Sequence, residues 1–150
     1  MRDIKQELYR LCQEYVDRRI EVSRAAIAQA QEAANEETKS SSGDKYETGR
    51  AMMQLEIEKN AGQLTESLKL KYALGQISID KQSDSVQPGS LVVTDREIFF
   101  VAISMGKVTY LNQSCIVISP ASPLAIKLMG LKPGAKMVFN NHHYVVKEVL

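Results

Sequence analysis

The first 42 residues contain neither glycine nor proline, and this most limits what the chain can fold into. These two residues disfavour a helix interior most strongly, so their absence favours one continuous helix. Apolar positions recur at spacings of four and three, first at Ile4, Leu8, Leu11 and Tyr15 and then, after a shift of phase, at Val16, Ile20, Ser23, Ile27, Ala30 and Ala34. So narrow a stripe is typical of a two-stranded coiled coil. The pattern predicts a helix over residues 3–37.

A second long helix is predicted after a polar break. Residues 38–43 are Ser-rich and end in Gly43, which marks a loop. From about residue 44 to 74 the helix period returns at Met53, Ile57, Ala61, Leu64, Leu68 and Tyr72. Two helices of similar length joined by a short loop form an antiparallel hairpin. About 30 residues at 1.5 Å each give a stalk of roughly 45 Å, and we expect it to project from the rest of the protein.

The period changes after a junction over residues 75–89. Segments 90–94 and 97–103 are predicted strands, and segments 107–111 and 114–118 are either two strands or one interrupted strand. Residues 122–129 are a predicted short helix, with Ser122 as N-cap, Pro123 at its first position and Gly130 just past its end. Segments 136–140 and 144–150 should form a hairpin across residues 141–143. The expected fold is α+β: a coiled-coil hairpin over residues 1–80, then a small, mostly antiparallel sheet domain with one short helix over residues 81–150.

Composition excludes few functions. The chain is 44% apolar and 25% charged with a net charge of +1, which is ordinary for a soluble protein and demands neither nucleic acid nor a membrane. The opening segment is too charged for a signal peptide, and no apolar run approaches the ~20 residues of a membrane span. Cys12 and Cys115 lie in different halves without CxxC spacing, which indicates reduced thiols and a cytoplasmic location.

Asp44 and Glu47 are the candidate functional acids. A spacing of three places them on one side of a starting helix, with Cβ atoms roughly 5–6 Å apart. One or two carboxylates typically hold a Mg²⁺ ion with its waters. The same pair also fits a variant of the capping box, with Asp44 as N-cap and Glu47 at the third helical position. Glu36 and Glu37 are either helpers in the same region or solvated surface.

Other polar residues have two interpretations each. Arg18, Arg19 and Arg24 could contact RNA or an acidic protein surface, or could be solvent-facing charge of a coiled coil. Tyr46 could stack on an RNA base or pack on the end of the hairpin. Cys115 with His142 or His143 is a poor nucleophile pair or zinc site, because consecutive strand residues face opposite ways and a thiol in an apolar strand is usually buried.

Several motifs carry a family resemblance. In the C-terminal part they are Val86-Gln-Pro-Gly-Ser90, Ile118-Ser-Pro-Ala-Ser-Pro-Leu-Ala125, Leu128-Met-Gly130, Lys132-Pro-Gly134 and Tyr144-Val-Val-Lys-Glu-Val149. In their order they resemble the C-terminal domain of the bacterial transcript cleavage factors GreA and GreB, which has an FKBP-like fold. The N-terminal hairpin, with Ala26-Ile27-Ala28 and Gly43-Asp-x-x-Glu47, resembles the coiled coil of that family.

The resemblance implies a function in transcription. Members bind RNA polymerase through its secondary channel, reach the 3′ end of nascent RNA, and stimulate the polymerase's own cleavage of backtracked RNA; DNA binding is also associated with them. The family's catalytic acids match Asp44 and Glu47, which would share Mg²⁺ only in the polymerase complex. The implied protein is no enzyme by itself and has no cofactor, small-molecule substrate or membrane partner of its own. Arg18, Arg19, Arg24 and Tyr46 are its expected partner-binding residues.

Three alternatives stay open at this point. The segment 32–42 is longer and more Ser-rich than the usual tip of the family, and Thr48 follows Glu47 where Asn is usual. A secondary-channel regulator that does not stimulate cleavage is therefore one alternative. An FKBP-like prolyl isomerase or peptide-binding module is another, and it would need an aromatic-lined pocket built from Phe99, Phe100, Tyr110, Phe139 and Tyr144. The third alternative is a coiled coil that simply dimerises.

Overall fold

The structure is a computed structural model that describes the backbone of residues 1–39 and 43–150 and the side chains of residues 1–36 and 47–150. The chain divides into two compact units. The sheet unit comprises Met1–Glu14 and Ala73–Leu150, and the hairpin unit comprises Tyr15–Tyr72. No helix in these described ranges is long and apolar enough to cross a membrane.

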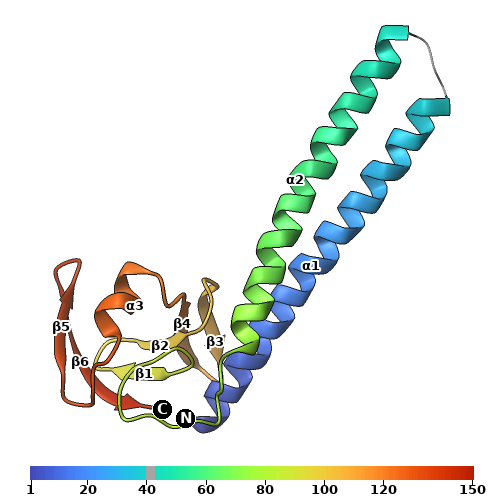
Figure 1. Ribbon diagram of the computed structural model, residues 1–150. Helices are drawn as coiled ribbons and strands as arrows, with labels where there is room; N and C mark the ends of the chain where they lie inside the picture. The colour runs from blue at the N-terminus through green and yellow to red at the C-terminus, as the bar shows by residue number, and fades with distance from the viewer. Residues whose placement is uncertain (40–42) are drawn as a thin grey trace. The chain divides into compact units, whose positions relative to one another are not determined.

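Two long helices form the first half of the chain, as predicted. Helix α1 spans Arg2–Lys39 and helix α2 spans Gly43–Gly75, and in the hairpin unit they run side by side (Figure 1). Lys71 Nζ, late in α2, lies 3.1 Å from Asp17 Oδ1, early in α1. Because the end of one helix meets the beginning of the other, the pair is an antiparallel hairpin.

The hairpin helices meet along a narrow seam with a seven-residue repeat. On α1 the buried side chains include Val16, Ser23 and Ala30, and on α2 they include Asn60 and Ser67. A repeat of seven keeps the same face of each helix toward its partner in a coiled coil. The expected α2 stripe is therefore partly wrong: Ala61, Leu68 and Tyr72 are exposed, whereas the repeat buries Asn60 and Ser67, one residue before Ala61 and Leu68.

The beginning of α1 belongs to the sheet unit. Ile4, Leu8 and Cys12, four residues apart, are buried there. Tyr9 Oη donates a hydrogen bond to the carbonyl oxygen of Leu74 at 2.9 Å, which ties α1 to the end of α2. This bond satisfies one of the carbonyl groups that the end of a helix leaves without an intrahelical partner.

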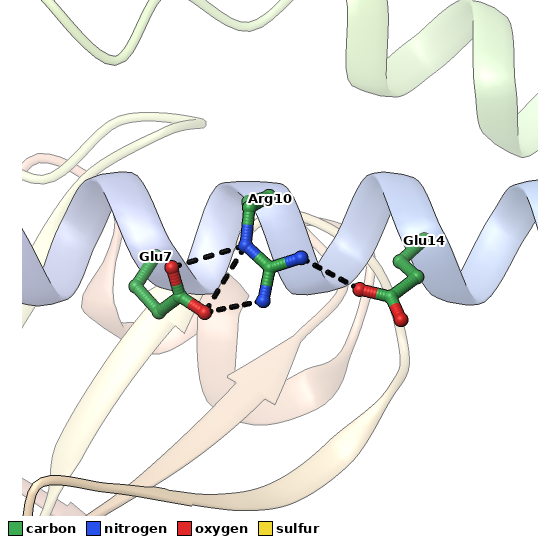
Figure 2. A network of polar contacts seen from close by, with 3 residues as sticks. All are labelled: Glu7, Arg10 and Glu14. Atoms are coloured by element: carbon green, nitrogen blue, oxygen red, sulfur yellow. Dashed lines mark hydrogen bonds and ion pairs between the residues drawn. The ribbon is translucent and has the colours of Figure 1, made fainter.

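An ion-pair network spans two turns on the exposed side of α1 (Figure 2). The Arg10 guanidinium donates to Glu7, with Nη2 2.5 Å from Oε1, and to Glu14, with Nη1 2.8 Å from Oε2. The hydrogen bond from Arg10 holds the pKa of Glu7 below its usual value. Spacings of three and four place these side chains over one another, so the network supports the helix locally.

The second half of the chain is a six-stranded sheet with one short helix. Its elements are β1 (Leu91–Thr94), β2 (Ile98–Val101), β3 (Gly106–Tyr110), β4 (Gln113–Ile118), α3 (Pro123–Leu128), β5 (Lys136–Phe139) and β6 (His142–Val149). The strand order is β3-β4-β2-β1-β6-β5. Every neighbouring pair is antiparallel except β2 and β4, which are parallel. The α+β fold class is confirmed, and residues 107–118 form two strands.

The core of the sheet unit lies between the sheet and α3. Phe99 is fully buried, and its ring packs edge-on against that of Tyr144 with centroids 5.9 Å apart. Helix α3 adds Ala125 and Leu128, both fully buried. Ser122 caps this helix by accepting a hydrogen bond from the backbone N–H of Ala125 at 3.3 Å, as the sequence predicted.

The last hairpin turns earlier than expected. Phe139 pairs with His142, so the turn is Asn140-Asn141, and His142 and His143 belong to β6. Both asparagines have positive φ, 50° and 63°, as a type I′ turn requires. Asparagine tolerates this conformation, and the twist of a type I′ turn matches the right-handed twist of the flanking strands. The prediction that residues 141–143 form the turn was therefore wrong.

Asn141→Val should lower the free energy of unfolding by about 1–2 kcal/mol, because a β-branched residue is strained at positive φ. Asn141→Gly should leave it unchanged or raise it slightly, since glycine adopts this conformation freely. Urea denaturation of both variants beside wild type measures the difference. Equal stability of the Val and Gly variants would contradict the turn assignment.

Candidate functional site

The predicted acid pair lies at the beginning of α2. Since the helix starts at Gly43, Asp44 and Glu47 both lie in its first two turns. Glu47 is exposed, whereas the side chain of Asp44 lies outside the described residues. Residues three apart on a helix are neighbours, with Cβ atoms roughly 5–6 Å apart. The backbone is therefore compatible with two carboxylates that act on one ligand.

A shallow hollow adjoins Glu47. It has a volume of about 370 Å³ and is lined by Glu47, Arg50, Ala51 and Gln54. A neighbouring hollow of about 420 Å³ shares Arg50 and Gln54 and is completed by α1; its other lining residues are Gln31, Ala34, Asn35 and Ile57. The second hollow is lined largely by amide and guanidinium groups, which hydrogen-bond polar ligands and water, whereas the surface of the hollow beside Glu47 is mostly apolar.

These lining residues were not predicted. Arg50 and Gln54 lie three and seven residues after Glu47, so helix periodicity alone would have placed them on its side of α2. Gln31 and Asn35 reach the hollow only through the pairing of α1 with α2. That pairing depends on the register of the hairpin, which the sequence pattern did not define.

Few side chains are available to hold a metal ion at the acid pair. Among the described residues no three His, Cys, Asp or Glu side chains come together as a metal-binding group. Mg²⁺ demands near-octahedral coordination and is usually held by one or two carboxylates with water and substrate oxygens. Exposed Glu47 on the same helix side as Asp44 fits such a partial site. The remaining ligands would have to come from water or from another molecule.

The predicted partner-binding arginines are exposed but do not form one patch. Arg18, Arg19 and Arg24 lie on α1, where each residue turns the helix by about 100°, so they leave it in three directions. Arg19 is already engaged with Tyr15: Nη1 donates to the phenol oxygen at 3.2 Å, and the guanidinium carbon lies 5.6 Å from the ring centroid. Glu36 on α1 is also exposed. The side chains of Glu37 and Tyr46 lie outside the described residues.

The thiol and the histidines are far apart in the sheet unit. Cys115 is fully buried on β4, while His142 and His143 are exposed on β6. The order β4-β2-β1-β6 places three inter-strand spacings between them, or about 14 Å at 4.8 Å each. His142 Nδ1 instead lies 3.3 Å from Arg96 Nη1. No nucleophile–base pair forms here, and burial raises the pKa of the Cys115 thiol.

The aromatic residues do not support a peptide-binding pocket. Phe99 and Phe100 are fully buried, and Tyr144 is only 6% exposed. Phe99 and Tyr144 belong to the core against α3 rather than to an open surface. An aromatic-lined groove of the prolyl-isomerase kind would need these rings to be accessible.

Cys12 makes the stability of the sheet unit depend on pH. Burial raises the pKa of its thiol from 9.0 to about 12. The unfolded chain therefore loses this proton near pH 9, but the folded chain keeps it to about pH 12. Its contribution to the free energy of unfolding is complete below pH 9 and falls by about 1.4 kcal/mol per unit above it.

Cys12→Ala tests this linkage because it removes the titrating thiol. The stability difference between wild type and Cys12→Ala should shrink by about 2 kcal/mol between pH 8 and pH 10.5. Urea denaturation at the two pH values gives the difference, and all other titrating groups cancel in it. An identical difference at both pH values would show that the thiol is not shielded from ionisation in the folded state.

Comparison of the chain with known protein families and with curated proteins gives no match.

Proposed function

We propose that this protein is a bacterial transcript cleavage factor of the GreA/GreB kind, which binds RNA polymerase and stimulates its cleavage of backtracked RNA. The observation that carries the proposal is the place of Asp44 and Glu47 at the turn end of an antiparallel helical hairpin, with Glu47 exposed. About 37 Å of α2 separates Glu47 from Tyr72 at 1.5 Å per residue. A helix of that length can carry the acids into a channel of another protein.

Asp44 and Glu47 would hold a Mg²⁺ ion together with carboxylates of the polymerase. When bound, such an ion stabilises the charge that develops on the phosphate and lowers the pKa of a coordinated water. The two side chains of this protein would act by positioning the reacting groups. Exposed Glu47 can accept a hydrogen bond from a water molecule and so orient it. Alignment of reacting groups alone can lower the activation barrier of a reaction substantially.

The protein would have no nuclease activity of its own. Two carboxylates cannot complete the coordination of Mg²⁺ or bind an RNA 3′ end, so the polymerase has to supply the rest of the site. The sheet unit would serve as a docking module on the outside of the polymerase. A role that is restricted to docking, with no effect on cleavage, is the non-cleaving regulator.

Three mixtures test the proposal: protein with RNA, a backtracked complex of the cognate polymerase by itself, and the complex with protein. RNA should be shortened at its 3′ end rapidly only in the third mixture. Binding of the protein to the polymerase is measured in parallel by gel filtration. If the protein binds but cleavage is not faster, the regulator is the correct function; if it does not bind, both proposals are wrong.

A further inference from the structure

Helix α2 carries two overlapping seam patterns in the hairpin unit. The observed one, here called the heptad seam, buries Asn60 and Ser67. One residue after each lies an exposed apolar residue, Ala61 and Leu68, and Tyr72 follows four residues later. We call the pattern of Ala61, Leu68 and Tyr72 the eleven-residue seam. Its apolar residues repeat at eleven, from Ile57 to Leu68 and from Ala61 to Tyr72. Ile57 and Leu64 belong to both patterns.

The polar side chains buried in the heptad seam have few hydrogen-bond partners. Ser67 is 1% exposed, and its hydroxyl has no hydrogen-bond partner among the described residues. Asn60 donates from Nδ2 to the Glu56 carbonyl oxygen at 2.8 Å, so its amide bonds within α2 rather than across to α1. A buried hydroxyl without a partner is costly. The observed seam therefore has little that holds it specifically.

The eleven-residue seam would bury more apolar surface. Leu68 is 42% and Tyr72 is 72% exposed in the observed arrangement. One residue corresponds to about 100° of helix rotation. Because the half-buried Ile57 and Leu64 belong to both patterns, the change needs only a part of that rotation. An eleven-residue spacing also packs with a different supercoil from a heptad.

One contact that opposes the change is an exposed ion pair. Lys71 Nζ lies 3.1 Å from Asp17 Oδ1, and both side chains are about 60% exposed (61% and 58%). Rotation toward Tyr72 would move Lys71 away from Asp17. Exposed pairs of this kind contribute little to stability and are weakened by salt.

We propose that α2 between Ile57 and Tyr72 interconverts between the heptad seam and the eleven-residue seam. The exchange breaks no covalent bond and keeps the helix intact. A partner that covers Leu68 and Tyr72 from outside selects the heptad seam, because it binds only the state in which they are exposed. The rotation of α2 in the hairpin unit thereby responds to binding on the face of Leu68 and Tyr72. This holds whichever function Asp44 and Glu47 serve.

Thiol labelling at position 67 tests the exchange. Ser67→Cys is nearly isosteric, and its new thiol is accessible to iodoacetamide only when position 67 leaves the seam. The buried Cys12 and Cys115 report opening of the sheet unit in the same sample. Mass spectrometry of peptides then gives three labelling rates, and position 67 should label well before Cys12.

Removal of the competing seam should slow this labelling. Leu68→Gln in the Ser67→Cys background should reduce the rate at position 67 about tenfold, since the eleven-residue seam loses a buried leucine. Leu55→Gln is the matched control: Leu55 is 66% exposed, belongs to neither seam, and should leave the rate unchanged. Tyr72→Gln is a second test. Because Tyr72 is largely exposed, its replacement should leave the hairpin folded.

An unchanged or faster rate at position 67 in both the Leu68→Gln and Tyr72→Gln variants would overturn the proposal. So would labelling of position 67 at the same rate as Cys12, because exposure would then need global unfolding. Higher salt should also speed labelling at position 67, because it weakens the Asp17–Lys71 pair that favours the heptad seam.

Discussion

Phe99→Ala should lower the free energy of unfolding of the sheet unit by about 3–5 kcal/mol. Phe99 is fully buried in the core cluster that joins the sheet to α3. Its ring also packs edge-on against Tyr144 at 5.9 Å. The truncation removes buried apolar area and the aromatic contact, and leaves a cavity that the surrounding strands can fill only partly.

Urea denaturation followed by circular dichroism measures this loss. Ile126→Ala is the matched control, because Ile126 is a large apolar residue of α3 that is 62% exposed. Its replacement should change stability by no more than about 0.5 kcal/mol. Similar losses for the two variants would contradict the assignment of the core to this side of the sheet.

Asp44→Ala combined with Glu47→Ala should reduce stimulated RNA cleavage by at least about 10²-fold at saturating protein. The estimate follows from the rate loss that misplacement of a reacting group by about 1 Å produces. Each single variant should lose most of this activity, since one carboxylate cannot replace two in positioning the same water. Affinity for the polymerase should change little, because docking would use other surfaces.

The matched control is Glu56→Ala combined with Glu58→Ala. These two acids are exposed on the same helix, so the control removes the same charge but leaves the beginning of α2 intact. It should cleave at the wild-type rate. An equal loss in both double variants would mean that net charge, rather than the position of Asp44 and Glu47, supports cleavage. Preserved cleavage in Asp44→Ala/Glu47→Ala would reduce the pair to a helix cap.

Local signals were sufficient to predict most elements. The absence of Gly and Pro before Gly43 defined α1, and Ser122, Pro123 and Gly130 defined α3, because these residues act within one turn of where they lie. The strands followed from short β-branched and aromatic runs between turn residues. None of these predictions required knowledge of which segments meet.

The predictions that failed depend on partners distant in the chain. Which face of α2 is buried depends on its pairing with α1, and in the observed pairing polar Asn60 and Ser67 are inside while Leu68 is exposed. The strand pairing of Phe139 with His142 moved the last turn to the asparagines. Likewise, Gln31 and Asn35 join the hollow near Glu47 only once the helices are paired.

The proposed function is tested most directly by the rate of RNA release from a backtracked complex of the cognate polymerase, with and without saturating protein. We predict faster release of the RNA 3′ end with the wild-type protein, and no RNA shortening when the polymerase is omitted. Unchanged release from a complex that has demonstrably bound the protein would contradict the proposal, and would leave Asp44 and Glu47 without a catalytic role.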